Sequence, residues 1–347
     1  MKENLFGKTL EELNSIVTEN ILPTYTGKQI ANWLYKKRCG SIDEMTNLSK
    51  SHREKLKEKF TVVHTAPVDV KISADGTKKY LFATTNGRFI EAAYIPENKR
   101  HTLCVSSQVG CKMGCFFCMT GKQGFQGNLN CSEILNQIFK ISESEILTNI
   151  VYMGMGEPLD NLEEVLKSLE ILTSDYGLAM SPTRITVSTI GILPALRTFI
   201  QRSKCHLAIS LHNPFPEERK RIMPIESIHN IHEITGLLKE SDFGRQRRIS
   251  FEYIMFRGLN DTPKHINGLA RLLDGLKCRI NLIRFHSIPG TRFISSDEET
   301  IEEFKDKLNK KGIVTTLRAS RGIDILAACG LLSTLKMQNT HEPEYKT

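Results

Sequence analysis

Apolar and polar positions follow two different periods along the chain, and a regular alternation of the two fills the stretch from residue 101 to residue 318. Short apolar runs there predict strands, and runs with apolar residues every three or four positions predict helices. The predicted strands are 101–106, 149–153, 184–188, 206–211, 249–255, 280–285 and 314–318. The predicted helices between them are 132–142, 161–173, 194–201, 231–239, 263–276 and 297–310.

This alternation of strand and helix favours a parallel sheet with crossover helices, either an open doubly wound sheet or a closed or partial barrel. About six strand–helix units in roughly 230 residues suit a partial barrel of TIM type. We therefore predict an α/β fold, a partial (β/α)6 barrel. In such folds the chemistry lies on the loops that follow the strands.

The first hundred residues carry other patterns. Residues 9–20 and 26–38 have helical spacing, and Thr9 with Glu12 suits a capping box. Residues 61–97 instead alternate with a period of two and contain Asp-Gly and Asn-Gly pairs, which favour tight hairpin turns. We expect four parts: a small helical domain of RNA-binding type at 1–60, a β-hairpin extension at 61–97, the barrel with a C-terminal cysteine-bearing segment at 98–335, and a tail at 336–347.

The charge of the chain permits a nucleic-acid partner without requiring one. Its 47 basic and 39 acidic residues leave a net charge of +8, and the basic residues cluster in four short runs, at 35–38, 50–59, 218–221 and 244–248. Each run could equally be a solvated face. No apolar stretch is long enough to span a membrane, and the N-terminus lacks a secretory signal, so we expect a cytoplasmic protein.

Nine cysteines are too many to be incidental, and an odd number in a chain of this kind disfavours a disulfide framework. Cys111, Cys115 and Cys118 form a C-x3-C-x2-C motif on the loop after the first barrel strand. Thiolates at this spacing can ligate zinc or iron, but a structural zinc site takes four ligands, and neither Cys104 nor Cys131 is close enough in sequence to complete the set. Three thiolates on a four-iron cluster would leave one iron open to a substrate or cofactor.

C-x3-C-x2-C at the first strand of a barrel resembles the signature of the radical S-adenosylmethionine (SAM) superfamily. Further stretches, in the same order, resemble its RlmN/Cfr branch of RNA-methylating enzymes: "LCVSSQVGCKMGCFFC", "MGMGEPL", "STIGILP", "AISLHNP", "RIMPI", "NLIRFH" and "RGIDILAACG". The resemblance spans residues 103–330. It implies a radical SAM barrel, a 4Fe–4S cluster on the three cysteines, and two SAM molecules per turnover.

The resemblance also implies a reaction, the methylation of C2 of an adenosine in 23S rRNA, at the peptidyl-transferase centre, and of the adenosine next to the anticodon in some tRNAs. A Cfr-like enzyme that methylates C8 is the alternative, but there we expect "CISSQCGC" and "SQFGIDI" where this chain has "CVSSQVGC" and "SRGIDI". A non-catalytic RNA-binding or cluster-carrying protein is a third hypothesis. The presence of Cys104, Cys329 and Glu91 beside the cysteine triad argues against it.

By the same resemblance, several residues at strand ends would contact SAM. A tight turn, a helix cap or a structural hydrogen bond would explain the same residue types without a ligand. His286 stands where many relatives have asparagine, and an imidazole could still hydrogen-bond the ribose. The predicted SAM contacts are Gly156, Glu157, Ser188, Ser210, Leu211, His212 and His286.

Three further residues would carry the methyl transfer in the family scheme. Adenine C2 is an electron-poor carbon, so a polar transfer from SAM cannot reach it. The first SAM would methylate Cys329, and the second would be cleaved reductively to activate that methyl group for addition to C2. Glu91 would then remove the C2 proton, and Cys104 would attack the sulfur of Cys329, releasing the RNA and leaving a disulfide. Without the resemblance, lone cysteines are more often small buried apolar residues.

The scheme needs two partners besides SAM. An electron donor such as flavodoxin or ferredoxin would reduce the cluster, and the target adenine must be flipped out or lie in a loop to reach a barrel interior. We expect a monomer.

Overall fold

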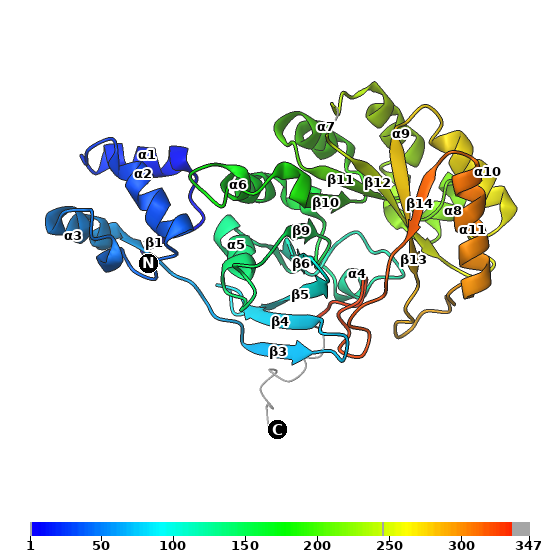
Figure 1. Cartoon of the computed structure of the whole chain (residues 1–347), viewed down its shortest axis with the longest axis horizontal. Coiled ribbons are helices and arrows are strands. Elements are labelled where there is room, and N and C mark those ends of the chain that lie inside the picture. Colours follow the sequence, from blue (N-terminus) through cyan, green and yellow to red (C-terminus); the bar gives the residue numbers. More distant parts are fainter. Residues whose placement is uncertain (1, 245, 335–347) are drawn as a thin grey trace, which may run out of the picture.

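The structure, a computed structural model, describes residues 2–244 and 246–334 of the 347-residue chain (Figure 1). In chain order, its strands are β1 (Glu3–Asn4), β2 (Phe60–Thr61), β3 (Asp69–Ile72), β4 (Lys78–Ala83), β5 (Phe89–Glu97), β6 (Arg100–Cys104), β7 (Gln108–Val109), β8 (Gly127–Asn128), β9 (Asn149–Tyr152), β10 (Ile185–Thr189), β11 (His206–Ser210), β12 (Ile249–Met255), β13 (Cys278–Arg284) and β14 (Val314–Leu317).

The α-helices are α1 (Leu10–Glu19), α2 (Thr26–Ala31), α3 (Lys50–Lys59), α4 (Met119–Gln123), α5 (Cys131–Phe139), α6 (Leu162–Thr173), α7 (Leu193–Arg202), α8 (Pro216–Lys220), α9 (Ile231–Glu240), α10 (Pro263–Leu272) and α11 (Glu298–Lys310). A π-helix, η1 (Asn32–Lys36), continues α2. Short 3-10 turns are η2 (Ile42–Glu44), η3 (Pro158–Asn161), η4 (Pro182–Arg184) and η5 (Pro224–Ser227).

Seven parallel strands form the barrel part of the fold, in the order β14-β13-β12-β11-β10-β9-β6. Helices α5, α6, α7, α9, α10 and α11 connect successive strands and lie around the outside of the sheet (Figure 1). The predicted strand–helix alternation is confirmed throughout this region. Within the described residues the sheet does not close: β14 forms one edge, so the barrel is partial, as predicted.

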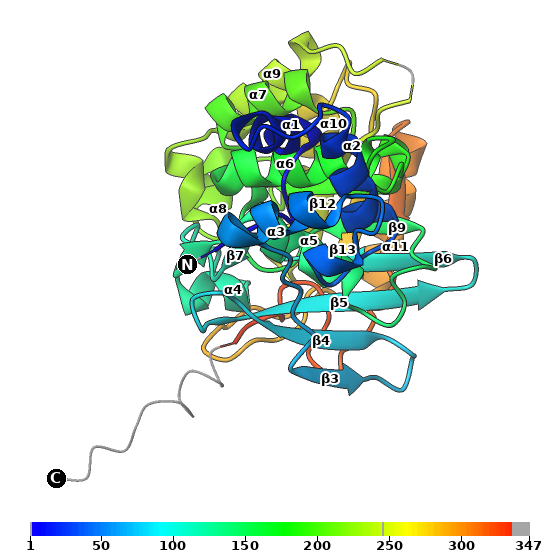
Figure 2. The same ribbon diagram turned by 90° about the vertical axis from the view of Figure 1, so that its left-hand side faces the viewer.

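The β-hairpin extension continues the same sheet. Strands β3, β4 and β5 add to β6 in antiparallel fashion, so ten strands form one sheet, and Figure 2 shows β3 to β6 lying side by side. Gly76 and Gly87 have φ of 83° and 70° at the two tight turns, where residues with a side chain are strained. The register places Ala93 of β5 opposite Cys104 of β6.

The N-terminal helices pack against the outside of α5 and α6 (Figures 1 and 2). Helix α1 begins with the predicted capping box between Thr9 and Glu12. Phe6 packs edge-on against Phe139 at 5.2 Å between ring centroids, and Lys167 donates to Glu12 at 2.8 Å. The apolar core is continuous between these helices and the barrel. The predicted tail at 336–347 lies outside the described residues.

The inner, concave face of the parallel sheet is polar, and the outer face is apolar. In β10, Ile185 and Val187 are buried beneath helices, whereas Thr186 and Ser188 on the other face are half-buried. Strands covered on both faces are normally apolar throughout. The polar inner face therefore belongs to a space that holds something other than core side chains.

Candidate active site

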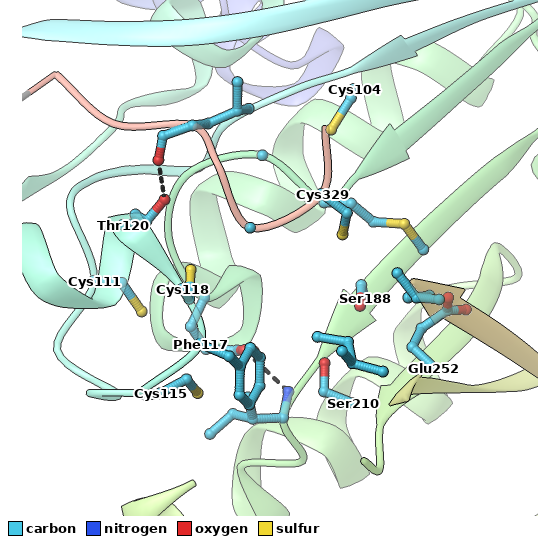
Figure 3. A pocket seen from close by; sticks show the side chains of 18 of the residues that line it. Cys104, Cys111, Cys115, Phe117, Cys118, Thr120, Ser188, Ser210, Glu252 and Cys329 are labelled. Carbon is cyan, nitrogen blue, oxygen red and sulfur yellow. Dashed lines mark hydrogen bonds between the residues drawn. The ribbon is translucent and has the colours of Figure 1, made fainter. Parts of the chain in front are cut away.

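The three cysteines of the motif line one pocket at the carboxyl ends of β6, β9, β10 and β11 (Figure 3). We call it the cluster pocket; it encloses about 1140 Å³, part of it open to solvent. Their loop leaves the short strand β7 and returns through α4 to β8, which pairs with β7. The backbone N–H of Phe116 donates to the carbonyl of Ile222 at 3.1 Å, which ties the loop to the turn after α8.

The cysteine triad suits a cluster better than one metal ion. Within residues 2–244 and 246–334, no three His, Cys, Asp or Glu side chains converge closely enough to hold a single ion. A cluster binds each thiolate through a different iron, so its ligands stand farther apart. Burial, and then each neighbouring thiol, raises the pKa of Cys115, and burial raises the pKa of Cys111 to about 12. Thiolates form in such a place only when a cation stabilises them.

Glu157 and Gly156 lie where the second barrel strand meets the pocket. The Glu157 carboxylate accepts from the backbone N–H groups of Leu159 and Ile190, each at 3.0 Å, and from the Thr189 hydroxyl at 2.5 Å. Burial raises its pKa to about 7, against these hydrogen bonds. A carboxylate can accept about four hydrogen bonds, so one acceptor direction remains for a ligand.

The glycines of this loop serve close packing as well as ligand access. Gly156 has φ of 98°, and a Cβ there would lie 2.5 Å from Cβ of Gln108. A Cβ on Gly154 would lie 2.7 Å from the Ser106 hydroxyl oxygen. The loop therefore presses against the backbone that leads from β6 to the cysteines, which couples the two sides of the pocket.

Ser188, Ser210 and His212 line the pocket from the ends of β10 and β11. The two serine hydroxyls have no hydrogen bond with any residue that the structure describes, so both can bind a ligand. The backbone N–H of Ile254 donates to Nδ1 of His212 at 3.1 Å. Burial, and then Arg219, lowers the pKa of His212 to about 3, so the ring is neutral with its proton on Nε2. The ring packs edge-on against Phe117 of the cysteine loop at 4.8 Å.

Two predicted SAM contacts lie elsewhere. The Leu211 side chain is fully buried in the core, and its carbonyl accepts from Nε of Arg219 at 3.0 Å. His286 follows β13 and lines a second, neighbouring pocket, where Nε2 lies 3.0 Å from the Ser320 hydroxyl. The structure thus groups the other five with the cysteine triad and leaves these two outside the cluster pocket.

Cys104 and Cys329 come together although 225 residues separate them in the sequence. Both line the cluster pocket, and Figure 3 shows their side chains near each other, with Cys329 between Cys104 and Cys118. Burial raises the pKa of the Cys104 thiol to about 12. The segment that carries Cys329 is irregular but anchored: the N–H of Met119 donates to the Gly330 carbonyl at 2.8 Å, and the Thr120 hydroxyl donates to the Leu332 carbonyl at 2.7 Å.

Glu91 lies on β5 beneath the same segment, on the face of the strand that also carries Ala93, and it does not line the cluster pocket. Its carboxylate pairs with Lys79 at 2.9 Å and accepts from the backbone N–H of Ser333 at 3.0 Å. Burial raises the pKa of Glu91, and Lys79 opposes the shift. A buried carboxylate is thus hydrogen-bonded directly to the segment that bears Cys329.

Two charged residues of the site were not predicted from the sequence. Glu252 of β12 and Arg318 after β14 line the cluster pocket and form an ion pair at 3.4 Å. Glu252 also accepts from the Asn281 amide at 2.7 Å. A single glutamate within the apolar run "ISFEYIM" was the available signal, because an unpaired charge is otherwise excluded from a buried strand.

Comparison with known proteins fits this arrangement. The Radical SAM superfamily matches residues 105–273, and the domain described as "Ribosomal RNA large subunit methyltransferase N-terminal domain" matches residues 3–62. A solved structure titled as a radical SAM methyltransferase from Sphaerobacter thermophilus is 36% identical, with a TM-score of 0.87, over 95% of this chain and 99% of that chain. The fold is that of a radical SAM methyltransferase, a class that uses SAM and a 4Fe–4S cluster.

Curated relatives identify the family within this class of methyltransferases. "Probable dual-specificity RNA methyltransferase RlmN" of Parabacteroides distasonis is 55% identical over 96% of this chain and 98% of its own length. "Dual-specificity RNA methyltransferase RlmN" of Nitratiruptor sp. is 41% identical over 95% of this chain and 97% of its own length. The chain belongs to the RlmN family of radical SAM RNA methyltransferases.

No helix within the described residues combines the length and apolar character that a membrane crossing requires.

Proposed function

We propose that this chain methylates C2 of an adenosine in 23S rRNA, at the peptidyl-transferase centre, and of the adenosine next to the anticodon in some tRNAs. The observation that carries the proposal is the pair Cys104 and Cys329 beside the cysteine triad in one pocket. The RlmN relatives support the choice of RNA. A methylase that transfers its carbon directly from SAM to a nucleophile needs no such pair of thiols.

Cys329 is the methyl carrier. Its thiolate attacks the methyl carbon of one SAM molecule, so a sulfur–carbon bond forms on Cys329 and S-adenosylhomocysteine leaves. Cys329 is exposed to the pocket space, which suits a thiol that must meet first SAM and then RNA. Burial raises the pKa of the Cys329 thiol, and Arg318, which lines the same pocket, opposes this rise.

Cys111, Cys115 and Cys118 hold the 4Fe–4S cluster, and Gly156, Glu157, Ser188, Ser210 and His212 line the space for SAM beside it. When bound, the cluster supplies the electron that cleaves the second SAM reductively. The Glu157 carboxylate suits the ammonium group of SAM. The neutral His212 ring can donate from Nε2. His286 and Leu211 are weaker candidates for SAM contacts, because neither lines this space.

The radical from the second SAM removes one hydrogen atom from the S-methyl group, and the resulting carbon radical bonds to C2. Glu91 then accepts the proton from C2, and one electron, which the oxidised cluster could accept, leaves the adduct. The raised pKa of Glu91 suits an acceptor near neutral pH. Its bond to the Ser333 N–H links it to the segment that carries the RNA adduct. A small shift of that segment is enough to free one carboxylate oxygen.

Cys104 resolves the adduct. Its thiolate attacks the sulfur of Cys329, a sulfur–sulfur bond forms, the bond from that sulfur to the bridging CH2 group breaks, and that carbon takes up a proton, so methylated RNA leaves. The burial of Cys104 keeps its thiol protonated until this step, which protects it from methylation by SAM. The disulfide must then be reduced before another turnover.

The remaining assignments extend this proposal. A flavodoxin or ferredoxin donates the electron, the enzyme acts as a cytoplasmic monomer, and the chain divides at 1–60, 61–97 and 98–335. Residues 1–60 assist RNA binding.

The deciding experiment is mass spectrometry of nucleosides from rRNA and tRNA treated with the reduced enzyme and SAM. We expect 2-methyladenosine in both. 8-Methyladenosine would assign the chain to the other branch, and the absence of any methylated adenosine with a loaded cluster would overturn the proposal.

A further inference from the structure

A second pocket extends along the inner face of the sheet, from the amino ends of the same strands to the segments after β13 and β14. We call it the amino-end basin. Side chains at alternate positions of the strands line it, as expected for residues that share one face. Its charged and imidazole residues are Glu97, Arg100, His206, Arg248, Glu252, Arg279, His286, Arg318 and Arg321.

The basin carries an excess of positive charge over the carboxylates that line it, among the residues that the structure describes. Five of those residues are arginines and two are carboxylates, and one carboxylate, Glu252, is already paired with Arg318. The guanidinium groups of Arg100, Arg248 and Arg279 form no ion pair or hydrogen bond with any residue in the described ranges. The Nε atom of Arg321 is buried and has no hydrogen-bond partner there. Guanidinium groups left free around one concavity suit a polyanion.

The pKa of His206 is also affected by the arginines of the basin. It lies at the first position of β11, and its Nδ1 accepts from the backbone N–H of Arg248 at 3.0 Å. Burial, and then Arg248, Arg247 and Arg279, lowers its pKa to about 4. A neutral imidazole at this rim presents a ring face and one N–H, which suit a ribose or a base, and adds no charge.

The basin leads to the reacting sulfur. Cys329, Glu252 and Arg318 line both pockets, so the two spaces meet at the methyl carrier. Four residues of strand separate Arg248 at the rim from Glu252, about 13 Å at 3.3 Å per residue. An arginine side chain and one nucleotide together can span this depth. A phosphate at the rim therefore lets an extruded adenine reach Cys329.

We propose that the amino-end basin binds the RNA sugar–phosphate backbone, so that the adenosine approaches Cys329 from the amino ends of the strands while SAM occupies the carboxyl ends. The inference rests on the proposed RNA methylation and specifies its substrate channel. Arg248 and Arg279 are the principal phosphate contacts. The guanidinium groups of both are unpaired, and Arg248 immediately precedes β12, whose neighbour β13 carries Arg279 opposite Ser250. Because Arg248 ends the basic run at 244–248, one of the four basic runs would thereby bind RNA.

The test compares Arg248→Gln, Arg279→Gln and the double variant with a control, Arg271→Gln, an exposed arginine on the outer helix α10. The probe is a stem–loop RNA with an unpaired adenosine, and binding is followed by fluorescence anisotropy between about 0.05 and 0.2 M salt. We expect each basin variant to bind about 10-fold more weakly and to reduce the slope of log affinity against log salt by about 1. The control should bind as the parent does.

A second measurement separates the channel from the chemistry. Methylation of Cys329 by SAM without RNA, read as the mass gain of one methyl group, should be unchanged in the basin variants, and with RNA their KM should rise while kcat at saturating RNA stays within about 2-fold. Unchanged RNA affinity in the double variant, or an equal loss in Arg271→Gln, would overturn the basin. If the parent binds the stem–loop through the basin but forms no methyladenosine, the proposed function fails and the RNA site stands. If Arg279→Gln does not fold, Arg248→Gln, at an exposed position, decides alone.

Discussion

The cluster pocket and the amino-end basin share one inner sheet face and differ in charge. The cysteine triad and Glu157 line only the first, Arg100, Arg248, Arg279 and Arg321 line only the second, and Glu252 and Arg318 line both. SAM is a cation at its sulfonium and ammonium groups, and RNA is a polyanion. The two ends of the same strands would therefore favour ligands of opposite charge. Arg318, Glu252 and Cys329 lie where the two pockets meet.

The largest effect on methylation should come from replacing Cys329, which lines both pockets. Cys329→Ala should reduce RNA methylation more than about a thousand-fold, because the carbon has no carrier. RNA affinity, set by the basin, should stay within about 2-fold. Radiolabelled methyl transfer and anisotropy on one preparation measure both. Cys278→Ala, at the outer side of β13, is the matched control, and residual turnover by Cys329→Ala would contradict the two-step transfer.

Cys104→Ala should leave the RNA trapped on the protein, at the point where the two pockets meet. Without a resolving thiol, RNA stays covalently attached to Cys329, and release of free product should fall about 100-fold or more. A denaturing gel should show a protein–RNA band that nuclease removes. Cys131→Ala, a buried thiol on α5, should give no such band. Free methylated RNA from Cys104→Ala would disprove the resolving role.

Glu157→Gln should affect SAM alone. Loss of one charged hydrogen bond should weaken SAM binding about 10- to 100-fold and leave RNA affinity unchanged. The pKa of Glu157 is raised to about 7, so its carboxylate fraction, and hence SAM affinity, should rise as pH increases through about 7. Calorimetry should show this rise in the parent and not in Glu157→Gln. Glu163→Gln, exposed on α6, serves as the control, and a pH-independent parent would refute the assignment.

Arg318→Gln should act at the boundary between the regions. Removal of the cation leaves the pKa of the Cys329 thiol higher, so less thiolate is present at neutral pH. Methylation of Cys329 should slow about 10-fold near pH 7, and the deficit should shrink as pH rises, because the thiolate fraction recovers. Rates of methyl incorporation across pH measure this. A deficit that is constant with pH would mean that Arg318 acts only as a structural partner of Glu252.

Thr9→Ala touches neither region and sets the baseline. The Thr9 hydroxyl accepts from the N–H of Glu12 at 3.2 Å in the cap of α1. Its loss should lower the free energy of unfolding by about 1 kcal/mol, measured by denaturant titration, with unchanged SAM affinity. A change in SAM affinity would show that the N-terminal helices act on the cluster pocket directly.

Periodicity in the sequence predicted the parallel strands and their helices closely, because burial beneath helices imposes a local pattern. The cysteine triad was equally visible, since its ligands lie within eight residues. What could not be predicted depends on distant pairing. The bond from Glu91 to Ser333 and the Ser73 hydroxyl bond to Asp324 at 2.5 Å join residues about 250 positions apart. The polar inner face, and with it the basin, becomes visible only when the strands are aligned in register.

The unbroken sheet from β3 to β14 also bears on how the molecule melts. Glu91 and Cys104 lie on adjacent, directly hydrogen-bonded strands, so no hinge separates the proposed proton acceptor from the proposed resolving thiol. The antiparallel strands and the parallel strands should consequently lose their amide protection against deuterium exchange in one cooperative step. Heat inactivation should then follow global unfolding, without an earlier stage in which the extension detaches.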